Sequence, residues 1–406
     1  MTGNRIDVLH AVTSSLSLVL LRGQLSYLRA DGFHPAVVCS PGPECEEIRV
    51  TESIPVFAVE MEREISPLRD LISLVRASRL IRQLGPMVSN SGTPKAGLLV
   101  GLAAFLNRVP CRIYTLRGLR LETATGPKRW TLRLTERIAC ACAHRVICVS
   151  PSLRRRAVEL GLVPPKKAIV LASGSSNGVD PSRFLPTVER LAKAAEIRRQ
   201  HGIGSHNAII GYVGRFTSDK GVPELMAAFR LLRQNFPSAV LLLVGSYEQG
   251  DPVPPETRAA IESDPGVIRV DFTSDIATYY FVMDMLVLPT HREGFPNVVL
   301  EAQAAARPVV TTCATGASDS ICDGVTGLLV PVGDVAALAN SLMKLLSEPE
   351  LAQRMGIAGR ERVINQYRCE TTWEALAGLY RELLHQRGLP APAKADSDSA
   401  MYAEGR

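Results

Sequence analysis

Strand-like apolar runs alternate with helical segments along this chain, and the alternation occurs twice. In the first half RIDVLHAV reads as a strand, LSLVLLRGQLSYLRADG as one helix ending at Gly32, and HPAVVCSPG as the next strand. In the second half the pattern restarts at HNAIIGYVGRF. Parallel strands need crossover connections, which are usually helices. The sequence therefore predicts α/β folding in both halves, each with a parallel, doubly wound sheet.

The length of 406 residues exceeds the size at which one hydrophobic core usually stops growing. We expect an N-terminal Rossmann-like domain over residues 1–184 and a second over 185–366, with loops from both sheets around one cleft. A helix pair is expected over roughly 334–386, of which 367–387 forms the closing helix. Residues 388–406 have the composition of a disordered tail.

Charge is divided unevenly between the halves. Residues 1–190 hold 26 basic and 15 acidic side chains, and residues 191–406 hold 20 and 25. This asymmetry indicates that the first half meets something anionic, although a solvated Arg-rich surface explains it equally well. Aromatic residues make up only 5%, which argues against a stacking platform for nucleic acid. We therefore expect no nucleic-acid partner.

The segment GYVGRFTSDKG, residues 211–221, places two cations directly after a strand. Arg215 and Lys220 lie in the loop that leads into the next helix, where main-chain N–H groups are unpaired. Two cations beside a helix N-terminus suit a diphosphate, and Gly214 permits close backbone approach. Taken alone, two such cations are more typical of ordinary surface charges on a loop.

The segment REGFPNVVLE places two acids around a second strand-to-helix turn. The turn consists of Gly294, Phe295, Pro296 and Asn297. Its free N–H groups can face an anion. Glu293 precedes the turn, and Glu301 lies about one helical turn after Asn297. Carboxylates accept hydrogen bonds from sugar hydroxyls, so one acid can hold a transferred sugar and the other a ribose; the alternative is a loop charge and a helix-stabilising charge.

Together VGRFTSDKG and REGFPNVVLE resemble glycosyltransferase family 4, whose GT-B fold has two Rossmann-like domains facing a cleft. The resemblance covers most of the chain. It implies a retaining enzyme that uses a nucleotide-sugar, with UDP as the expected nucleotide, and needs no metal. It also implies that Arg215 and Lys220 bind the donor diphosphate during catalysis, that Glu293 contacts the donor sugar and aids catalysis, and that Glu301 binds the ribose. The closing helix resembles the one that crosses back onto the first domain.

The first half most resembles bacterial transferases that build capsule, exopolysaccharide or O-antigen repeats on polyprenyl diphosphate. A lipid-linked glycan is therefore the expected acceptor. The expected acceptor-side residues are Ser14, Ser15, Arg117, Glu122 and Asn177. Arg117 stands where many members have a histidine and, being always protonated, cannot act as a general base. It is either a ligand for the acceptor diphosphate or a structural loop arginine.

The helix around Arg129, Arg133 and Arg137, with Trp130 interleaved, is typical of contact with an anionic membrane, or of a solvated helix face. No apolar run is long enough to span a bilayer and no signal peptide is recognisable, so we expect a cytoplasmic protein, peripheral on the inner membrane face. Two other functions remain open: a GT-B nucleotide-sugar epimerase, and a transferase with a soluble acceptor. A catalytically silent subunit is disfavoured because Lys220 and Glu293 are both present.

Overall fold

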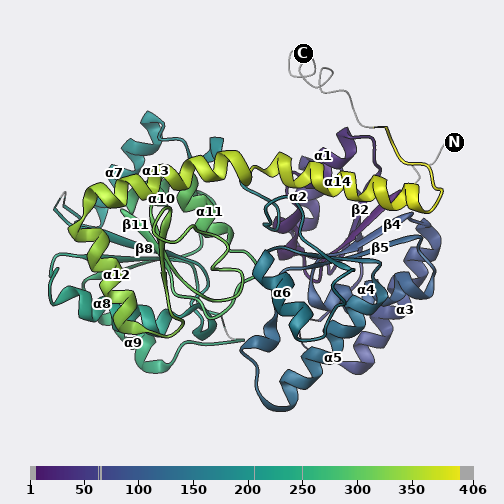
Figure 1. Ribbon diagram of the computed structural model, residues 1–406, viewed down its shortest axis with the longest axis horizontal. Helices are drawn as coiled ribbons and strands as arrows, with labels where there is room; N and C mark the ends of the chain where they lie inside the picture. Colours follow the sequence, from purple (N-terminus) through teal and green to yellow (C-terminus); the bar gives the residue numbers. More distant parts are fainter. Residues whose placement is uncertain (1–5, 63, 65, 205, 249, 394–406) are drawn as a thin grey trace. The chain divides into compact units, whose positions relative to one another are not determined.

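The computed structural model describes residues 6–62, 64, 66–204, 206–248 and 250–393, which form two compact units (Figure 1). Unit 1 extends to Asn177 and resumes at Cys369, and unit 2 is Gly178–Arg368. The boundary lies a few residues before the predicted one at 184/185. The reason is that the main-chain N–H of Val179 donates to Tyr367 O (2.8 Å), which fixes this segment to unit 2.

Unit 1 contains a parallel sheet with strand order β3-β2-β1-β4-β5-β6-β7. Its strands are β1 (Val8–Ala11), β2 (Pro35–Cys39), β3 (Val56–Ala58), β4 (Val88–Ser91), β5 (Cys111–Leu116), β6 (Arg145–Cys148) and β7 (Ala168–Ile169). Its helices are η1 (Ser15–Leu21), α1 (Gln24–Ala30), α2 (Glu44–Thr51), α3 (Pro67–Leu84), α4 (Pro94–Leu106), η2 (Arg120–Glu122), α5 (Gly126–Cys142), α6 (Pro151–Glu159) and α14 (Cys369–Gln386), where η marks a 3₁₀ helix. The predicted alternation of parallel strands and crossover helices is confirmed.

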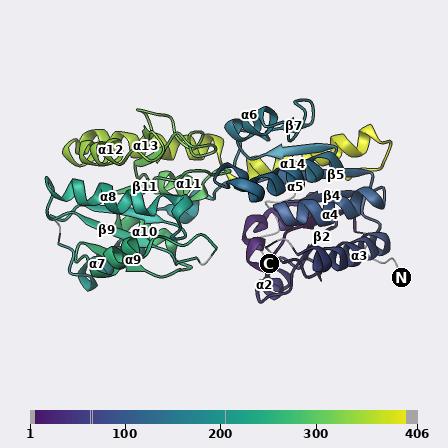
Figure 2. The same ribbon diagram turned by 90° about the horizontal axis from the view of Figure 1, so that it is seen from below.

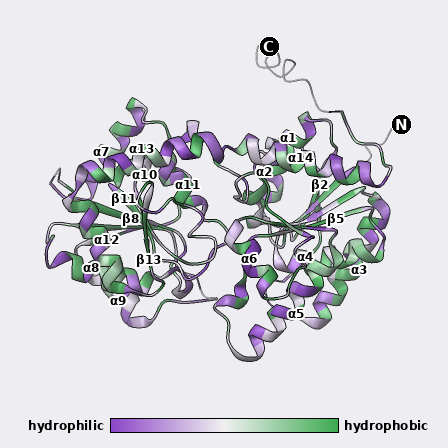
Figure 3. Cartoon of the chain, viewed as in Figure 1, coloured by the Kyte–Doolittle hydropathy of each residue, from purple (hydrophilic) through white to green (hydrophobic). Residues whose placement is uncertain are grey.

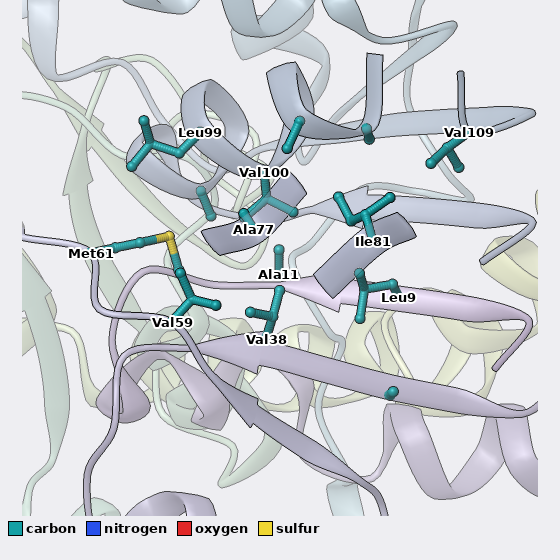
Figure 4. Close-up of a cluster of buried hydrophobic side chains, with 14 of the residues drawn as sticks. Leu9, Ala11, Val38, Val59, Met61, Ala77, Ile81, Leu99, Val100 and Val109 are labelled. Carbon is teal, nitrogen blue, oxygen red and sulfur yellow. The ribbon is translucent and has the colours of Figure 1, made fainter. Parts of the chain in front are cut away.

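Helices cover both faces of this sheet. On one face, α3 and α4 bury Ala77, Ile81 and Val100 against Leu9 and Val38 of the central strands (Figure 4). Helix α4 lies between α3 and α5 (Figure 2). On the other face α14 contributes its own buried residues, so the last described helix completes the core of the first unit. The burial of apolar area on both faces is what stabilises a parallel sheet of this kind.

The predicted helix ending at Gly32 is wrong in its extent. The structure has the 3₁₀ helix η1 and then α1, with the break at Arg22 and Gly23. Gly23 has φ of 75°, in the left-handed region that ends one helical segment. A Cβ atom there would lie 2.7 Å from the Trp373 ring of α14, so the turn also allows close packing of the last helix.

Unit 2 contains a second parallel sheet, with strand order β10-β9-β8-β11-β12-β13. Its strands are β8 (Ile209–Val213), β9 (Val240–Val244), β10 (Val267–Val270), β11 (Met285–Leu288), β12 (Val309–Thr312) and β13 (Gly327–Val330). Its helices are η3 (Pro181–Phe184), α7 (Val188–Gln200), η4 (Ser218–Lys220), α8 (Val222–Arg233), α9 (Pro255–Ser263), α10 (Ile276–Val282), α11 (Asn297–Ala304), α12 (Val335–Ser347) and α13 (Pro349–Gln366). Strand order reverses between β8 and β11, and ligands of such sheets bind at that point, beyond the carboxyl ends of the strands.

The C-terminal segment differs from the prediction in two respects. The stretch expected to hold a helix pair contains α12, α13 and α14, because Pro349 starts a new helix that its missing N–H permits. The predicted disordered tail begins too early. Leu389 packs against the core of unit 1, and Arg381 donates to Pro392 O at 2.9 Å. The predicted tail residues 394–406 lie outside the described residues.

A buried carboxyl in α5 predicts a pH-dependent stability of unit 1. Glu136 is 5% exposed and accepts a hydrogen bond from the Tyr114 hydroxyl at 2.9 Å. Burial raises its pKa from 4.5 to about 7. The folded chain therefore holds this proton more tightly than the unfolded chain does. Between about pH 4.5 and 7 the unfolded chain loses the proton first, so the free energy of unfolding falls as pH rises, by up to about 3 kcal/mol.

Urea unfolding of the wild type and of Glu136→Gln at pH 5 and pH 8 measures this effect. The substitution keeps an acceptor for Tyr114 but cannot ionise. We expect the wild type to lose more stability than the variant between the two pH values. Equal losses in the two proteins would contradict a raised pKa at this carboxyl.

Candidate active site

The loop after β8 brings the two predicted cations to the switch point of the unit 2 sheet. Arg215 lies two residues beyond the strand, and its main-chain carbonyl accepts a hydrogen bond from the buried Tyr212 hydroxyl (2.6 Å). Lys220 ends η4, directly before α8. Gly221 follows with φ of 71°, and a Cβ atom there would lie 1.9 Å from Pro289 O. Glycine at this position lets the loop after β8 approach the loop after β11.

The loop after β11 carries Glu293 and is held by main-chain contacts. The Glu293 N–H donates to Thr315 O at 2.9 Å, beyond the end of β12. Thr290 lies fully buried beneath the loop and donates from its hydroxyl to Arg292 O (3.0 Å). Arg292 also pairs with Asp219 Oδ2 at 2.5 Å, which links the loop to η4. The loop is therefore fixed to the strands and helices on both sides.

Lys220 and Glu293 contact each other directly. Lys220 Nζ lies 2.5 Å from Glu293 Oε1, and the two side chains are only 13% and 15% exposed. A largely buried ion pair of this kind is weak evidence for stability, because the free-energy cost of removing both charges from water is about as large as the gain from their attraction. Its position beyond the carboxyl ends of two neighbouring strands is typical of a functional site.

Arg215 lies in the same group of charges. Its guanidinium pairs with Glu248, which follows β9 and which sequence reasoning missed. Burial lowers the pKa of Arg215, but the nearby Glu248, Asp219 and Glu293 raise it further, so the net pKa is above its usual value. Arg215 thus remains fully charged, with acids on several sides and nearly half of its side chain exposed.

Glu301 lies on α11, the helix that begins directly after the Glu293 loop. Its Oε2 accepts a hydrogen bond from the fully buried Tyr280 hydroxyl at 2.7 Å, a partner that sequence reasoning also missed. Burial raises the pKa of the Glu301 carboxyl, against the opposing effect of that hydrogen bond. At the start of the same helix, Asn297 Oδ1 is buried and has no hydrogen-bond partner among the described residues. An unpaired buried oxygen is costly, and a ligand donor there would satisfy it.

The remaining turn residues surround these groups. Gly294, Phe295 and Pro296 are buried, and Pro296 is the N-cap of α11. His291 is held by Glu224, with 2.9 Å between Nε2 and Oε1, and this hydrogen bond raises the pKa of the imidazole. The histidine beside the Glu293 loop therefore has a structural partner within unit 2.

The predicted acceptor-side residues lie in unit 1, most of them in internal contacts. Arg117 follows β5 and donates to Gly92 O (2.5 Å) and Ser176 Oγ (2.6 Å). Burial lowers its pKa to about 10, and its side chain lines a cavity of only about 20 Å³. These contacts favour the structural alternative for Arg117 over a ligand role.

Asn177 and Glu122 are also held within unit 1. Asn177 Oδ1 accepts from Trp373 Nε1 (2.6 Å) and Gln24 Nε2 (3.2 Å). Glu122 Oε1 lies 3.2 Å from Arg156 Nε. Both residues therefore connect neighbouring elements of unit 1, and their roles toward an acceptor stay predictions.

Ser14 and Ser15 stand beyond the carboxyl end of β1, at the start of η1. The Ser14 and Ser17 hydroxyls lie 3.1 Å apart, and Ser15 is 7% exposed. Beside them the Thr13 N–H donates to the Thr93 hydroxyl at 2.9 Å, which joins the ends of β1 and β4. This is the switch point of the unit 1 sheet, a position suited to ligand contact.

Comparison with known proteins assigns both units. The family model described as "Glycosyl transferase 4-like domain" matches residues 17–174, and "Glycosyl transferases group 1" matches 193–362. The capsular polysaccharide biosynthesis glycosyltransferase CapM of Staphylococcus aureus is 37% identical over 379 residues, covering 93% of this chain and 98% of CapM. The chain belongs to glycosyltransferase family 4.

A more distant relative and two solved structures are also similar to the chain, and the solved structures show its fold. The Escherichia coli UDP-Gal:alpha-D-GlcNAc-diphosphoundecaprenol alpha-1,3-galactosyltransferase is 23% identical to this glycosyltransferase, covering 81% of the chain and 84% of the relative. The crystal structure of Anabaena Alr3699/HepE in complex with UDP and glucose has a TM-score of 0.77 at 19% identity, and the match covers 93% of this chain and 99% of HepE. The crystal structure of WaaG, a glycosyltransferase described as involved in lipopolysaccharide biosynthesis, has a TM-score of 0.68 at 16% identity. The match covers 92% of this chain and 99% of WaaG. The GT-B fold predicted from the motifs is confirmed.

Within the described ranges no helix has the length and apolar character needed to cross a bilayer. In the same part of the chain, His, Cys, Asp and Glu side chains form no group of three that could hold a metal ion. That the reaction needs no metal stays a prediction.

Proposed function

We propose that this glycosyltransferase moves a hexose or N-acetylhexosamine from a UDP-sugar, with retention at the anomeric carbon, to a glycan on polyprenyl diphosphate. The product would enter a cell-surface polysaccharide such as capsule. The observation that carries the proposal is the Lys220–Glu293 pair beside Arg215, at the switch point of unit 2. The names of the relatives support the choice of substrates: CapM for capsule, and the galactosyltransferase for a diphosphoundecaprenol acceptor. UDP in the HepE complexes supports the nucleotide.

The four charged residues of the site would contact different parts of the donor. Arg215 and Lys220 would contact the donor diphosphate and neutralise the charge that develops as it departs, which is where electrostatic catalysis has its largest effect. Lys220 would exchange its contact with Glu293 for the phosphate oxygens, so Glu293 becomes available to the sugar hydroxyls. Glu301, one turn into α11, would accept hydrogen bonds from the ribose.

The proposed reaction proceeds on one face of the sugar. The bond between the anomeric carbon and the β-phosphate oxygen breaks, and the acceptor oxygen bonds to the same face of that carbon. The acceptor hydroxyl proton passes to the departing phosphate oxygen, and UDP leaves. Arg117 cannot take this proton, because it is cationic and fixed to Gly92 and Ser176.

Peripheral contact with the inner face of the cytoplasmic membrane belongs to the same proposal. Arg129, Arg133 and Arg137 are exposed on α5, and Trp130 beside them is 71% exposed. Each basic residue near an anionic surface contributes about 1 kcal/mol at most. A lipid-linked acceptor would be presented at such a surface.

The proposal is tested by donor binding followed by transfer. Thermal unfolding is measured with UDP-, GDP- and ADP-sugars, since a ligand at about 100 times its Kd stabilises the folded state by about 2.7 kcal/mol. We expect only UDP-sugars to raise the melting temperature. The stabilising donor, radiolabelled, should then transfer its sugar to lipid extracted from membranes, and not to soluble sugars. Stabilisation by GDP- or ADP-sugars alone, or label only on soluble products, would contradict the proposal.

A chelator distinguishes the proposed metal-free reaction from metal-dependent transfer. Because two cations are proposed to neutralise the diphosphate, we expect the initial rate to be unchanged after treatment with EDTA and desalting. A rate that falls in EDTA and returns with Mg²⁺ or Mn²⁺ would show that a metal takes part.

A further inference from the structure

A second candidate site lies in unit 1 and includes none of the predicted acceptor-side residues. A cavity of about 330 Å³ opens between α4, α5 and the segment that follows β5. Its lining includes Lys95, Leu98, Arg120, Lys128, Leu132 and Glu136. Lys95 belongs to the first turn of α4, and Arg120 begins η2. The cavity therefore lies beyond the carboxyl ends of β4 and β5, where parallel sheets bind ligands.

The three cations of this cavity differ in how firmly acids hold them. Lys95 is 8% exposed, with its Nζ 2.7 Å from both oxygens of Asp70. Arg120 lies 3.4 Å from the exposed Glu64. Lys128 is exposed and has no acidic partner among the described residues. Glu136 has its pKa raised by burial to about 7, so it carries less than a full negative charge near neutral pH. An anion entering here would find Lys128 free and Arg120 only weakly held.

One wall of the cavity continues into an apolar surface. Leu98 lines the cavity, and Leu102 and Phe105 follow it on the same side of α4, at helical spacing. Phe105 is 48% exposed. Helix α4 is coloured almost entirely as hydrophobic in Figure 3. An apolar chain whose charged end occupied the cavity could therefore lie along this helix.

The neighbouring helix α3 has exposed apolar side chains of its own. On α3, Leu68 is 80% and Leu71 is 58% exposed, in a stripe of large apolar side chains. The only acids of α3, α4 and α5 are Asp70 and Glu136, and neither is exposed. The outer sides of these helices thus offer cations and apolar groups, a combination that suits an amphiphilic anion. Acids outside the helices pair with two of the cations, Arg69 and Arg76 of α3.

We propose that this cavity binds the diphosphate end of an isoprenoid lipid through Lys128 and Arg120, and that the isoprenoid chain lies along Leu98, Leu102 and Phe105 of α4. The inference rests on the proposed lipid-linked acceptor and assigns its place in unit 1. Binding of the diphosphate displaces the exposed Glu64 from Arg120. Lys95 stays paired with Asp70 and positions the first turn of α4.

Calorimetric titration of the full chain with geranylgeranyl diphosphate tests the proposal. We expect Lys128→Ala and Arg120→Ala each to weaken binding about 10-fold, since each removes a charge-assisted hydrogen bond. Lys166→Ala is the matched control, because Lys166 is exposed, lies in unit 1 and lines no part of the cavity. Leu98→Asn should weaken the prenyl diphosphate but leave binding of inorganic pyrophosphate unchanged.

Several results would overturn the proposal. One is that the wild type shows no binding of geranylgeranyl diphosphate, and another is that Lys166→Ala weakens that binding as much as Lys128→Ala and Arg120→Ala do. A third such result is that the wild type binds a short-chain anionic phospholipid as tightly as it binds geranylgeranyl diphosphate, which would make the cavity a site for bilayer headgroups. Titration of the same variants with UDP separates this proposal from the proposed function. A wild type that binds UDP but no prenyl diphosphate contradicts only the cavity proposal, whereas a wild type that binds no UDP contradicts the donor site.

Discussion

Replacing Lys220 by alanine is expected to lower kcat/KM by about 10³-fold. Lys220 is largely buried, ends η4 just before α8, and contacts Glu293 at 2.5 Å. Removal of one preorganised group that stabilises developing charge typically costs 10²–10³ in rate. Alanine also leaves Glu293 without its cation, and this acid would then repel the diphosphate. Weaker UDP binding should therefore accompany the loss of rate.

The measurement is initial rate against donor concentration, with UDP affinity determined by calorimetry. Lys344→Ala is the matched control, since Lys344 is exposed on α12 of the same unit. Melting temperatures of all three proteins show whether the variant is folded. A folded Lys220→Ala enzyme within a few-fold of the wild type would exclude this lysine from the reaction.

Glu293→Gln is expected to lower kcat by about 10²-fold while UDP affinity stays the same or improves. The amide keeps the size of the side chain and a contact with Lys220, but it removes the negative charge proposed to act on the donor sugar. Loss of an interaction made mainly in the transition state lowers kcat and kcat/KM together. Binding of UDP alone involves no sugar and should not suffer.

The control for this variant is Glu361→Gln, an exposed position on α13. Single-turnover transfer and UDP titration are measured for both proteins. If Glu293→Gln raised only the KM for the donor and kept kcat, Glu293 would be a binding residue alone, and its proposed part in catalysis would be wrong.

The meeting of Lys220 and Glu293 was predictable because it follows from topology. Each residue lies a few positions beyond a buried strand, and the two strands, β8 and β11, are neighbours in the sheet. Loops at the same edge of neighbouring parallel strands are near each other whatever their exact conformation. The same reasoning placed both sheets, because continuous apolar runs between helical segments indicate buried parallel strands.

The partners of these residues were not predictable in the same way. Glu248 follows β9, next to β8, so its position after a strand was a usable signal, but its pairing with Arg215 depends on the loop conformation. Tyr280 meets Glu301 only through the packing of α10 near α11, which no local pattern indicates. Whether Arg117 faces a ligand or the protein interior likewise depends on its contacts with Gly92 and Ser176.

A crystal structure of the chain grown with UDP tests the central claim most directly. The diphosphate oxygens are predicted to lie about 3 Å from Lys220 Nζ and from the Arg215 guanidinium, with the ribose hydroxyls against Glu301. Clear density for UDP in unit 1, or in unit 2 away from the ends of β8 and β11, would contradict the account.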